Sequence, residues 1–181
     1  LLSRRQRQMC IRDRTITVTY QEKTATFNIT VYDIISIKVK EYFGKTSVFF
    51  IGDENTGTYR YAAKSLTVTY ENGEEETVSY GNFTETLVDT SKAGSYYTTI
   101  SYKGKEIQNP YTVYGSPFTT TTGYPDKESA TATLDLNTGV CTILGTNQVG
   151  VPVNTPRSFG EKIKELKISE GIIGIYRFTF C

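Results

Sequence analysis

A short acidic segment has the residue types of a calcium loop. Residues 135–139 read Asp-Leu-Asn-Thr-Gly, and oxygen ligands at alternate positions suit a hard cation such as Ca²⁺. The complete EF-hand loop also needs a bidentate glutamate at its twelfth position, where this chain has Thr146. We therefore interpret the segment as a hairpin turn. Residues 53–55, Asp-Glu-Asn, could help to bind calcium at a domain junction, but a solvated loop is the simpler interpretation.

Catalytic chemistry has little support in this composition. The chain contains no histidine, which removes the commonest general base and every Ser-His-Asp or Cys-His arrangement. Cys10, Cys141 and Cys181 have neither the spacing of a zinc site nor that of a disulfide framework. No glycine-rich phosphate loop or serine elbow is present. We predict a chain that is not an enzyme, with no catalytic, metal or cofactor-binding residues and no cofactor.

Aromatic residues are the remaining candidates for a site, because exposed rings can stack on sugars. The chain has 14 tyrosines and nine phenylalanines but no tryptophan. The clusters to consider are Tyr42-Phe43, Tyr59, Tyr61 and Tyr96-Tyr97. Tyrosine in sheets commonly packs across strands instead, so sugar binding is the alternative hypothesis. A Lys-Asn crosslink beside an acid is a further hypothesis, although no spacing selects a pair.

The elements that must position these residues are strands. Residues 15–32 alternate apolar side chains with threonine on both sides of a polar turn, which predicts an antiparallel hairpin. Residues 66–80 repeat the pattern around Asn72-Gly73, a pair typical of type I′ turns. No window of helical length has an apolar face, and at most one helical turn is expected near residues 159–165. The chain is predicted to be all-β.

Two local features predict strand edges. Glu74, Glu75 and Glu76 form a charged run, which protects an edge strand from pairing with another chain. Pro110 falls inside a strand pattern, where its missing N–H favours an edge or a bulge.

An internal repeat organises the first two thirds of the chain. Residue n resembles residue n + 82 at six of fifteen positions: Val18 and Ile100, Tyr20 and Tyr102, Lys23 and Lys105, Thr30 and Thr112, Val31 and Val113, Tyr32 and Tyr114. This period is the length of one small β-sandwich. We therefore expect residues 15–33 to be the closing hairpin of one truncated domain and residues 34–115 to be a complete second copy.

Within that second copy, four segments carry a family resemblance. They are residues 66–73 (Leu-Thr-Val-Thr-Tyr-Glu-Asn-Gly), 88–96 (Val-Asp-Thr-Ser-Lys-Ala-Gly-Ser-Tyr), 100–105 and 111–113. Together they resemble the bacterial immunoglobulin-like domains strung along surface proteins. The resemblance covers about 80 residues and implies an immunoglobulin-like β-sandwich.

The composition then changes. Residues 116–129 are rich in threonine, proline and glycine and are predicted to be a linker. Residues 130–181 combine a hairpin with the pattern Ile-x-x-Leu-x-Ile-x-x-Gly-Ile-x-x-Ile, and resemble the entry to the leucine-rich repeats of BspA-like surface proteins, although Tyr176 stands where glycine is usual. One repeat cannot bury its own apolar face, so the resemblance implies a truncated first repeat of a longer array.

The N-terminal residues 1–14 form a basic segment, with five arginines, one aspartate and a net charge of +4 against −3 for the remainder. This segment resembles a translated sequencing-adapter artefact of metagenome-derived sequences, and Cys10 would be part of it. We therefore expect residues 1–14 to be a non-native or disordered basic tail. A genuine basic tail, which would suggest nucleic acid, an anionic membrane or a transit peptide, is the alternative. No stretch approaches the ~20 apolar residues of a membrane span. We expect no nucleic-acid partner and no membrane span.

These resemblances imply a non-catalytic stalk or adhesion segment of a secreted or cell-surface bacterial protein, which presents a leucine-rich-repeat binding region. The expected location is extracellular or on the cell surface, and the expected partner is a host or cell-surface protein or glycan. An accessory carbohydrate-binding module of a larger polysaccharide-degrading enzyme is the alternative. The sequence does not select the ligand, the anchoring mode or the number of flanking repeats.

Overall fold

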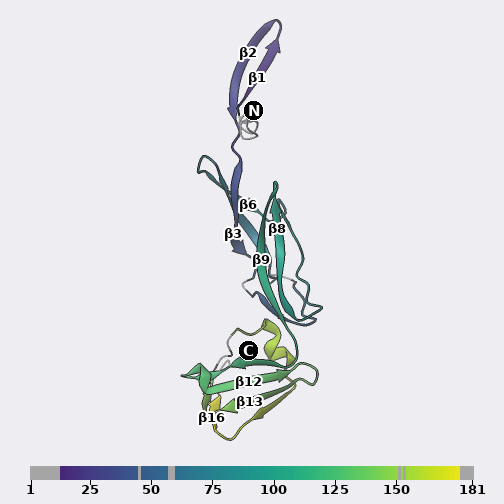
Figure 1. Cartoon of the computed structure of the whole chain (residues 1–181), viewed down its shortest axis with the longest axis vertical. Helices are drawn as coiled ribbons and strands as arrows, with labels where there is room; N and C mark the ends of the chain where they lie inside the picture. Colours follow the sequence, from purple (N-terminus) through teal and green to yellow (C-terminus); the bar gives the residue numbers. More distant parts are fainter. Residues whose placement is uncertain (1–12, 45, 57–59, 151, 153, 176–181) are drawn as a thin grey trace, which may run out of the picture.

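The computed structural model describes residues 13–44, 46–56, 60–150, 152 and 154–175. Within this part the chain forms strands and two short 3-10 helices, so the predicted all-β class is confirmed. An N-terminal hairpin, a β-sandwich and a C-terminal β unit follow one another along the long axis of the molecule (Figure 1). None of the described helices is long and apolar enough to span a membrane.

The N-terminal hairpin consists of β1 (Asp13–Tyr20) and β2 (Lys23–Thr30), which pair antiparallel as predicted. Gln21 and Glu22 have φ of 44° and 62°, the positive values that a type I′ turn requires. The predicted basic tail therefore ends earlier than residue 14, because Asp13 and Arg14 belong to β1. Residues 1–12, with Cys10, lie outside the described residues.

The β-sandwich contains two sheets that face one another. One sheet has the order β3 (Ile34–Tyr42), β5 (Ala63–Tyr70), β6 (Glu75–Ser79). The other has the order β4 (Val48–Phe50), β9 (Lys105–Tyr114), β8 (Gly94–Tyr102), β7 (Thr84–Glu85). All pairs are antiparallel except β4 with β9. Buried residues from both sheets form the core: Ile37, Ala63, Leu66, Val68, Val78, Phe83, Ile100 and Tyr102.

The turn after β5 differs from the predicted type I′ turn. Tyr70 donates its backbone N–H to the carbonyl of Glu74, which leaves a three-residue loop, and Gly73 has a φ of 83°. A three-residue hairpin loop with its last residue in the left-handed region is the next commonest solution. The Asn-Gly pair therefore predicted the hairpin correctly, but the loop has three residues and not the two of a type I′ turn.

The strand edge predicted at the glutamate run is confirmed, whereas Pro110 lies in β9, which has a neighbouring strand on each side. β6 lies at the edge of its sheet and carries Glu75 and Glu76, which are exposed. Pro110 pairs with Tyr97 of β8, whereas the pairing of β9 with β4 on its other side begins only at Thr112. The missing N–H of Pro110 therefore costs no hydrogen bond in the sheet.

The repeat of 82 residues reappears in the backbone. Tyr20 pairs with Lys23 in the N-terminal hairpin, and Tyr102 pairs with Lys105 in the hairpin of β8 and β9. Lys103 and Gly104 have φ of 43° and 80°, so this turn is also type I′. The two hairpins therefore share both turn type and strand register.

The C-terminal unit also has two sheets. One has the order β10 (Phe118–Thr121), β12 (Ala130–Asp135), β13 (Val140–Gly145), β15 (Glu165–Ile168). The other has the order β11 (Gly123–Tyr124), β14 (Asn147–Val149), β16 (Ile172–Ile175). β15 and β16 pair in parallel with β13 and β14. The 3-10 helices are η3 (Lys127–Ser129) and η4 (Arg157–Lys162), and η4 lies where a helical turn was predicted.

The prediction that residues 116–129 form a linker is wrong in part, because strand β10 lies within them and pairs with β12. Phe118, Thr120 and Thr122 are buried, whereas Thr119 is exposed. Buried and exposed side chains therefore alternate along the segment, as in a strand. Threonine occupies both kinds of position, so the sequence shows no alternation of apolar and polar residues. Threonine is β-branched and favours strands. The wider division of the chain into domains stays a prediction.

Candidate functional site

The junction between the sandwich and the C-terminal unit is built on strand β4. Successive side chains of a strand point to opposite faces, and β4 uses this alternation to contact two cores. Phe49 packs with Tyr61, Tyr111 and Val113 in the sandwich. Phe50 belongs instead to the core of the C-terminal unit. One short strand thereby connects both parts of the molecule.

Phe50 is fully buried among aromatic rings of the C-terminal unit. Its ring meets that of Phe118 edge-on, with centroids 5.1 Å apart, and lies 6.4 Å from the ring of Phe159. Phe118 and Phe159 are themselves 6.0 Å apart. Edge-to-face packing at these separations is favourable beyond the burial of apolar area. The aromatic cluster fixes Phe50, and with it the sandwich, against the C-terminal unit.

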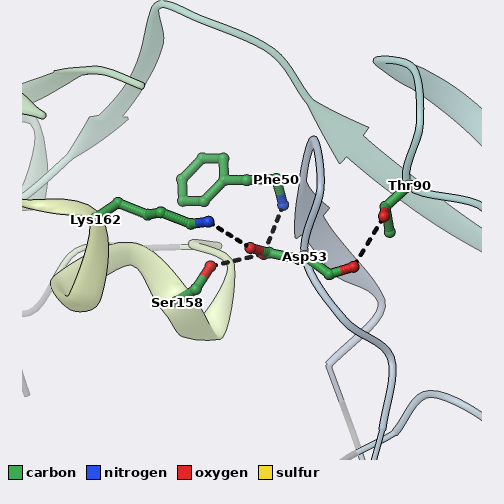
Figure 2. A network of polar contacts seen from close by, with 5 residues as sticks. All are labelled: Phe50, Asp53, Thr90, Ser158 and Lys162. Atoms are coloured by element: carbon green, nitrogen blue, oxygen red, sulfur yellow. Dashed lines mark hydrogen bonds and ion pairs between the residues drawn. The ribbon is translucent and has the colours of Figure 1, made fainter. Parts of the chain in front are cut away.

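Asp53 adds a polar network beside this cluster (Figure 2). Its carboxylate accepts hydrogen bonds from the backbone N–H of Phe50 at 2.9 Å and from the hydroxyl of Ser158 at 2.6 Å. Lys162 lies 3.2 Å from the other carboxylate oxygen. The backbone carbonyl of Asp53 accepts a hydrogen bond from the hydroxyl of Thr90 at 2.8 Å. Asp53 therefore ties its own loop to both η4 and the sandwich.

The interpretation of residues 53–55 as a solvated loop is wrong for Asp53, because its side chain is largely buried. The side chain of Asp53 is 11% exposed, and that of Lys162 is 37% exposed. Ser158 is 105 positions away in sequence, which is why no local pattern identifies this partner. Asn55 also contributes, since its amide oxygen accepts from the backbone N–H of Tyr61 at 2.6 Å. Among the described residues, no group of three or more acidic or cysteine side chains could hold a metal ion.

A cleft of about 420 Å³ opens beside Asp53. Its charged and amide lining residues are Asp53, Glu54, Asn55, Arg157, Glu161 and Lys162. Because carboxylates and cations both line it, the cleft has no charge of a single sign to attract an ion. We therefore treat the junction as a structural connection and not as a ligand pocket.

The segment that resembles a calcium loop is a hairpin turn between β12 and β13, as predicted. The Asp135 carboxylate accepts hydrogen bonds from the backbone N–H of Asn137 at 2.9 Å and from the hydroxyls of Ser116 and Thr138 at 2.8 and 3.0 Å. These bonds stabilise the charged form, and so the pKa of Asp135 is below its usual value. The carboxylate serves the turn and its connection to residue 116.

Two tyrosines considered for sugar stacking pack against each other, with Tyr61 buried and Tyr42 37% exposed. The rings of Tyr42 and Tyr61 stack with centroids 5.4 Å apart. Both hydroxyls donate to the side-chain oxygen of Asn109, at 2.8 and 2.7 Å. Burial raises the pKa of both tyrosines, that of Tyr61 more strongly. The side-chain amide nitrogen of Asn109 is buried without a hydrogen-bond partner among the described residues. The hypothesis of a Lys-Asn crosslink is not tested by these contacts.

The other aromatic candidates are divided between packing and exposure. Tyr96 packs against Tyr111 at 5.6 Å, and Phe43 packs against Tyr80. Tyr97 is 60% exposed, and Tyr59 lies outside the described residues. The sequence did not suggest Arg60, whose guanidinium lies 4.4 Å from the ring centres of both Phe43 and Tyr80.

The C-terminal segment that resembles a leucine-rich repeat forms β15 and β16. Each of these strands pairs in parallel with one neighbour and lies at the edge of its sheet. Apolar side chains on these strands are exposed: Leu166, Ile168, Ile173 and Ile175. Residues 176–181, with Tyr176 and Cys181, lie outside the described residues. The assignment to a leucine-rich repeat stays a prediction.

Comparisons with known proteins identify no family. No protein-family model matches the chain, and no curated protein matches it. The solution structure of a candidate surface protein is similar to it, with 20% identity over 49% of this chain and 96% of that one. The TM-score is 0.24, which is too low to support an argument about fold or function.

Proposed function

We propose that this chain is a non-catalytic stalk segment of a secreted or cell-surface bacterial protein, and that it presents its C-terminal unit to a host or cell-surface protein or glycan. The observation that carries the proposal is the junction, where Phe50 and Asp53 of the sandwich both contact the C-terminal unit. A stalk must hold successive units at a fixed distance and angle, and direct contacts between the units do this.

The junction combines two kinds of contact that restrict different motions. Phe50 fills an apolar core, and its withdrawal would leave a cavity between Phe118 and Phe159. Asp53 forms directional contacts with Ser158 and Lys162, which oppose rotation about that core. Linked units without such contacts move relative to one another by default. The parts follow one another along the long axis (Figure 1), as expected of a spacer.

The end of the C-terminal unit is the surface that the stalk would present. β15 and β16 leave open parallel edges, and Ile173 and Ile175 are exposed there. In a solenoid, the next repeat covers such an edge. We infer that a leucine-rich-repeat region stacks on these strands, which follows the sequence resemblance and provides the binding surface.

Distances between spin labels on the two units test the stalk. In a Cys10→Ser/Cys181→Ser background, labels at Leu87→Cys and Leu144→Cys occupy exposed positions in the sandwich and in β13. We expect a narrow distance distribution that Asp53→Ala broadens. Glu41→Ala is the matched control, because it also removes one carboxylate from an ion pair, the exposed one with Lys64. A broad distribution in the parent chain would contradict a rigid stalk.

Small-angle scattering and glycan arrays complete the test. Scattering from the full chain should give an elongated particle, and a compact globule would count against the proposal. Glycan-array binding that disappears in Tyr97→Ala, which removes a tyrosine that is 60% exposed, would favour an accessory carbohydrate-binding module instead.

A further inference from the structure

The N-terminal hairpin has one apolar face that no other part of the chain covers among the residues that the structure describes. Ile16 pairs with Phe27 and Val18 with Ala25, so these four side chains share a face. The exposed large residues of the hairpin and the segment that follows it are Ile16, Val18, Tyr20, Phe27, Val31 and Tyr32. The opposite face consists mainly of threonines. A lone two-stranded hairpin is at best marginally stable in water.

The same face is buried in the repeat of this hairpin. Residues 97–114 have the register of residues 15–32, as described above. Val18 is 55% exposed, whereas its equivalent Ile100 is 0% exposed. Tyr20 is 73% exposed, whereas its equivalent Tyr102 is 9% exposed. The apolar pattern of the N-terminal hairpin is therefore that of a buried sheet face.

The second copy also shows what covers such a face. Ile100 and Tyr102 pack in one core with residues of the opposite three-stranded sheet. Those residues are Ile37 of β3, Ala63, Leu66 and Val68 of β5, and Val78 of β6. The matching cover for the N-terminal hairpin is a sheet of the same construction and not a second hairpin.

We propose that the apolar face of β1 and β2 is a docking surface for a three-stranded antiparallel sheet of the kind formed by β3, β5 and β6, and that docking completes a second β-sandwich. This inference goes beyond the proposed stalk, because it concerns the other end of the molecule. The partner sheet presents aliphatic side chains toward Ile16, Val18 and Phe27, while the threonine face stays in water.

One difference between the repeats specifies the partner more closely. Phe27 is the equivalent of Asn109, whose side-chain oxygen accepts from the hydroxyls of Tyr42 and Tyr61. Phenylalanine cannot accept these hydrogen bonds, and an unpaired buried hydroxyl is costly. The partner sheet therefore has apolar residues where β3 and the start of β5 carry this tyrosine pair.

A graft tests the proposal with the sheet that this chain already contains. Residue 15 is the equivalent of residue 97, so a second copy of residues 34–96 is joined directly before Thr15 in place of residues 1–14. Hydrogen exchange is compared between this chimera and the original full chain. We expect the amides of β1 and β2 to become at least about a hundred-fold more protected in the chimera.

Three substitutions in the acceptor hairpin make the result specific. Val18→Asp should abolish the added protection, whereas Thr17→Asp on the opposite face should preserve it. Phe27→Asn should increase it, because the grafted sheet carries its own tyrosine pair. Exchange in β8 and β9 reports that the rest of the chain is folded in each variant.

Two outcomes would overturn the inference. In the first, β1 and β2 exchange as fast in the chimera as in the original chain while β8 and β9 stay protected. In the second, the original chain sediments as a dimer, and Val18→Asp both dissociates it and exposes β1 and β2. That second result would assign the face to another copy of this chain.

Discussion

Cys141 shows how burial controls reactivity at a single residue. It lies in β13, is fully buried, and packs in the core of the C-terminal unit. Burial disfavours the thiolate and raises the pKa of the thiol to about 11. At pH 8 only about one thiol in a thousand would be ionised, and the thiolate is the nucleophile.

We predict that Cys141 resists alkylation until the chain unfolds. In a Cys10→Ser/Cys181→Ser variant, iodoacetamide at pH 8 should leave the intact mass unchanged under native conditions. The same reagent should add one carbamidomethyl group in denaturant. Native labelling at the denatured rate would contradict the buried position of this thiol.

Asp135 gives the stability a dependence on pH whose sign can be worked out. Its pKa is lowered in the folded chain from the reference value of 3.8. A lowered folded-state pKa contributes stability that is present above the unfolded value and is lost as the pH falls through the folded one. Asp135→Asn should therefore lower the free energy of unfolding at pH 7 and have less effect at pH 3. Equal losses at both pH values in urea titrations would refute this.

The two aspartates also show what a sequence can predict at this scale. The partners of Asp135 in its turn lie within three positions, and its segment was correctly predicted as a hairpin turn. The partners of Asp53 in η4 lie more than 100 positions away. No local spacing encodes that contact, because it exists only after the C-terminal unit has folded against β4.

Two turns contain a glycine at which the added Cβ of alanine would have different neighbours. Gly73 and Gly139 both have positive φ, of 83° and 77°. A Cβ at Gly73 would meet nothing within 4 Å, whereas one at Gly139 would lie 2.7 Å from Cγ of Lys164 and 3.0 Å from the carbonyl of Lys162. The first substitution strains only the backbone, and the second also displaces the chain that enters β15.

We predict that Gly73→Ala lowers the free energy of unfolding by about 1 kcal/mol, the usual cost of a left-handed alanine. Gly139→Ala should cost at least about 1 kcal/mol more, because its Cβ meets backbone as well. Chemical denaturation of both variants measures the difference. Equal effects would mean that the segment around Lys164 moves freely.

Strand patterns were predictable wherever apolar and polar residues alternate, as in β1, β2 and β5. β10 escaped prediction because threonine occupies both its buried and its exposed positions. The parallel pairing of β15 with β13 was equally hidden, since pairing partners depend on contacts distant in sequence. Residue pattern identifies strands more readily than it identifies their neighbours.

Phe50 belongs to both units of the molecule. Its backbone pairs with β9 in the sandwich, and its ring lies in the C-terminal core. Phe49, the adjacent residue, places its ring in the sandwich alone. The two phenylalanines are therefore a matched pair on one strand, and only one of them couples the units.

We predict that Phe50→Ala costs about 3–5 kcal/mol, as expected for a buried phenylalanine, and separates unfolding into two transitions. Phe49→Ala should lower the stability of the sandwich and give a single transition at a lower midpoint, because Phe50 still couples the units. Calorimetry together with residue-resolved hydrogen exchange distinguishes these results. A single transition in Phe50→Ala would show that other contacts couple the units.

The parallel pairing of β4 with β9 has a mechanical consequence. Tension applied along the chain reaches the C-terminal unit through the end of β9, where Thr112 donates to Ser47 and Ile51 donates to Tyr114. Because these hydrogen bonds lie across the strand direction, a pull along β9 loads them in shear, together and not one after another. Phe50 at the end of β4 and Asp53 in the loop after it hold β4 to the C-terminal unit. The junction between the two units would therefore also resist tension along the chain.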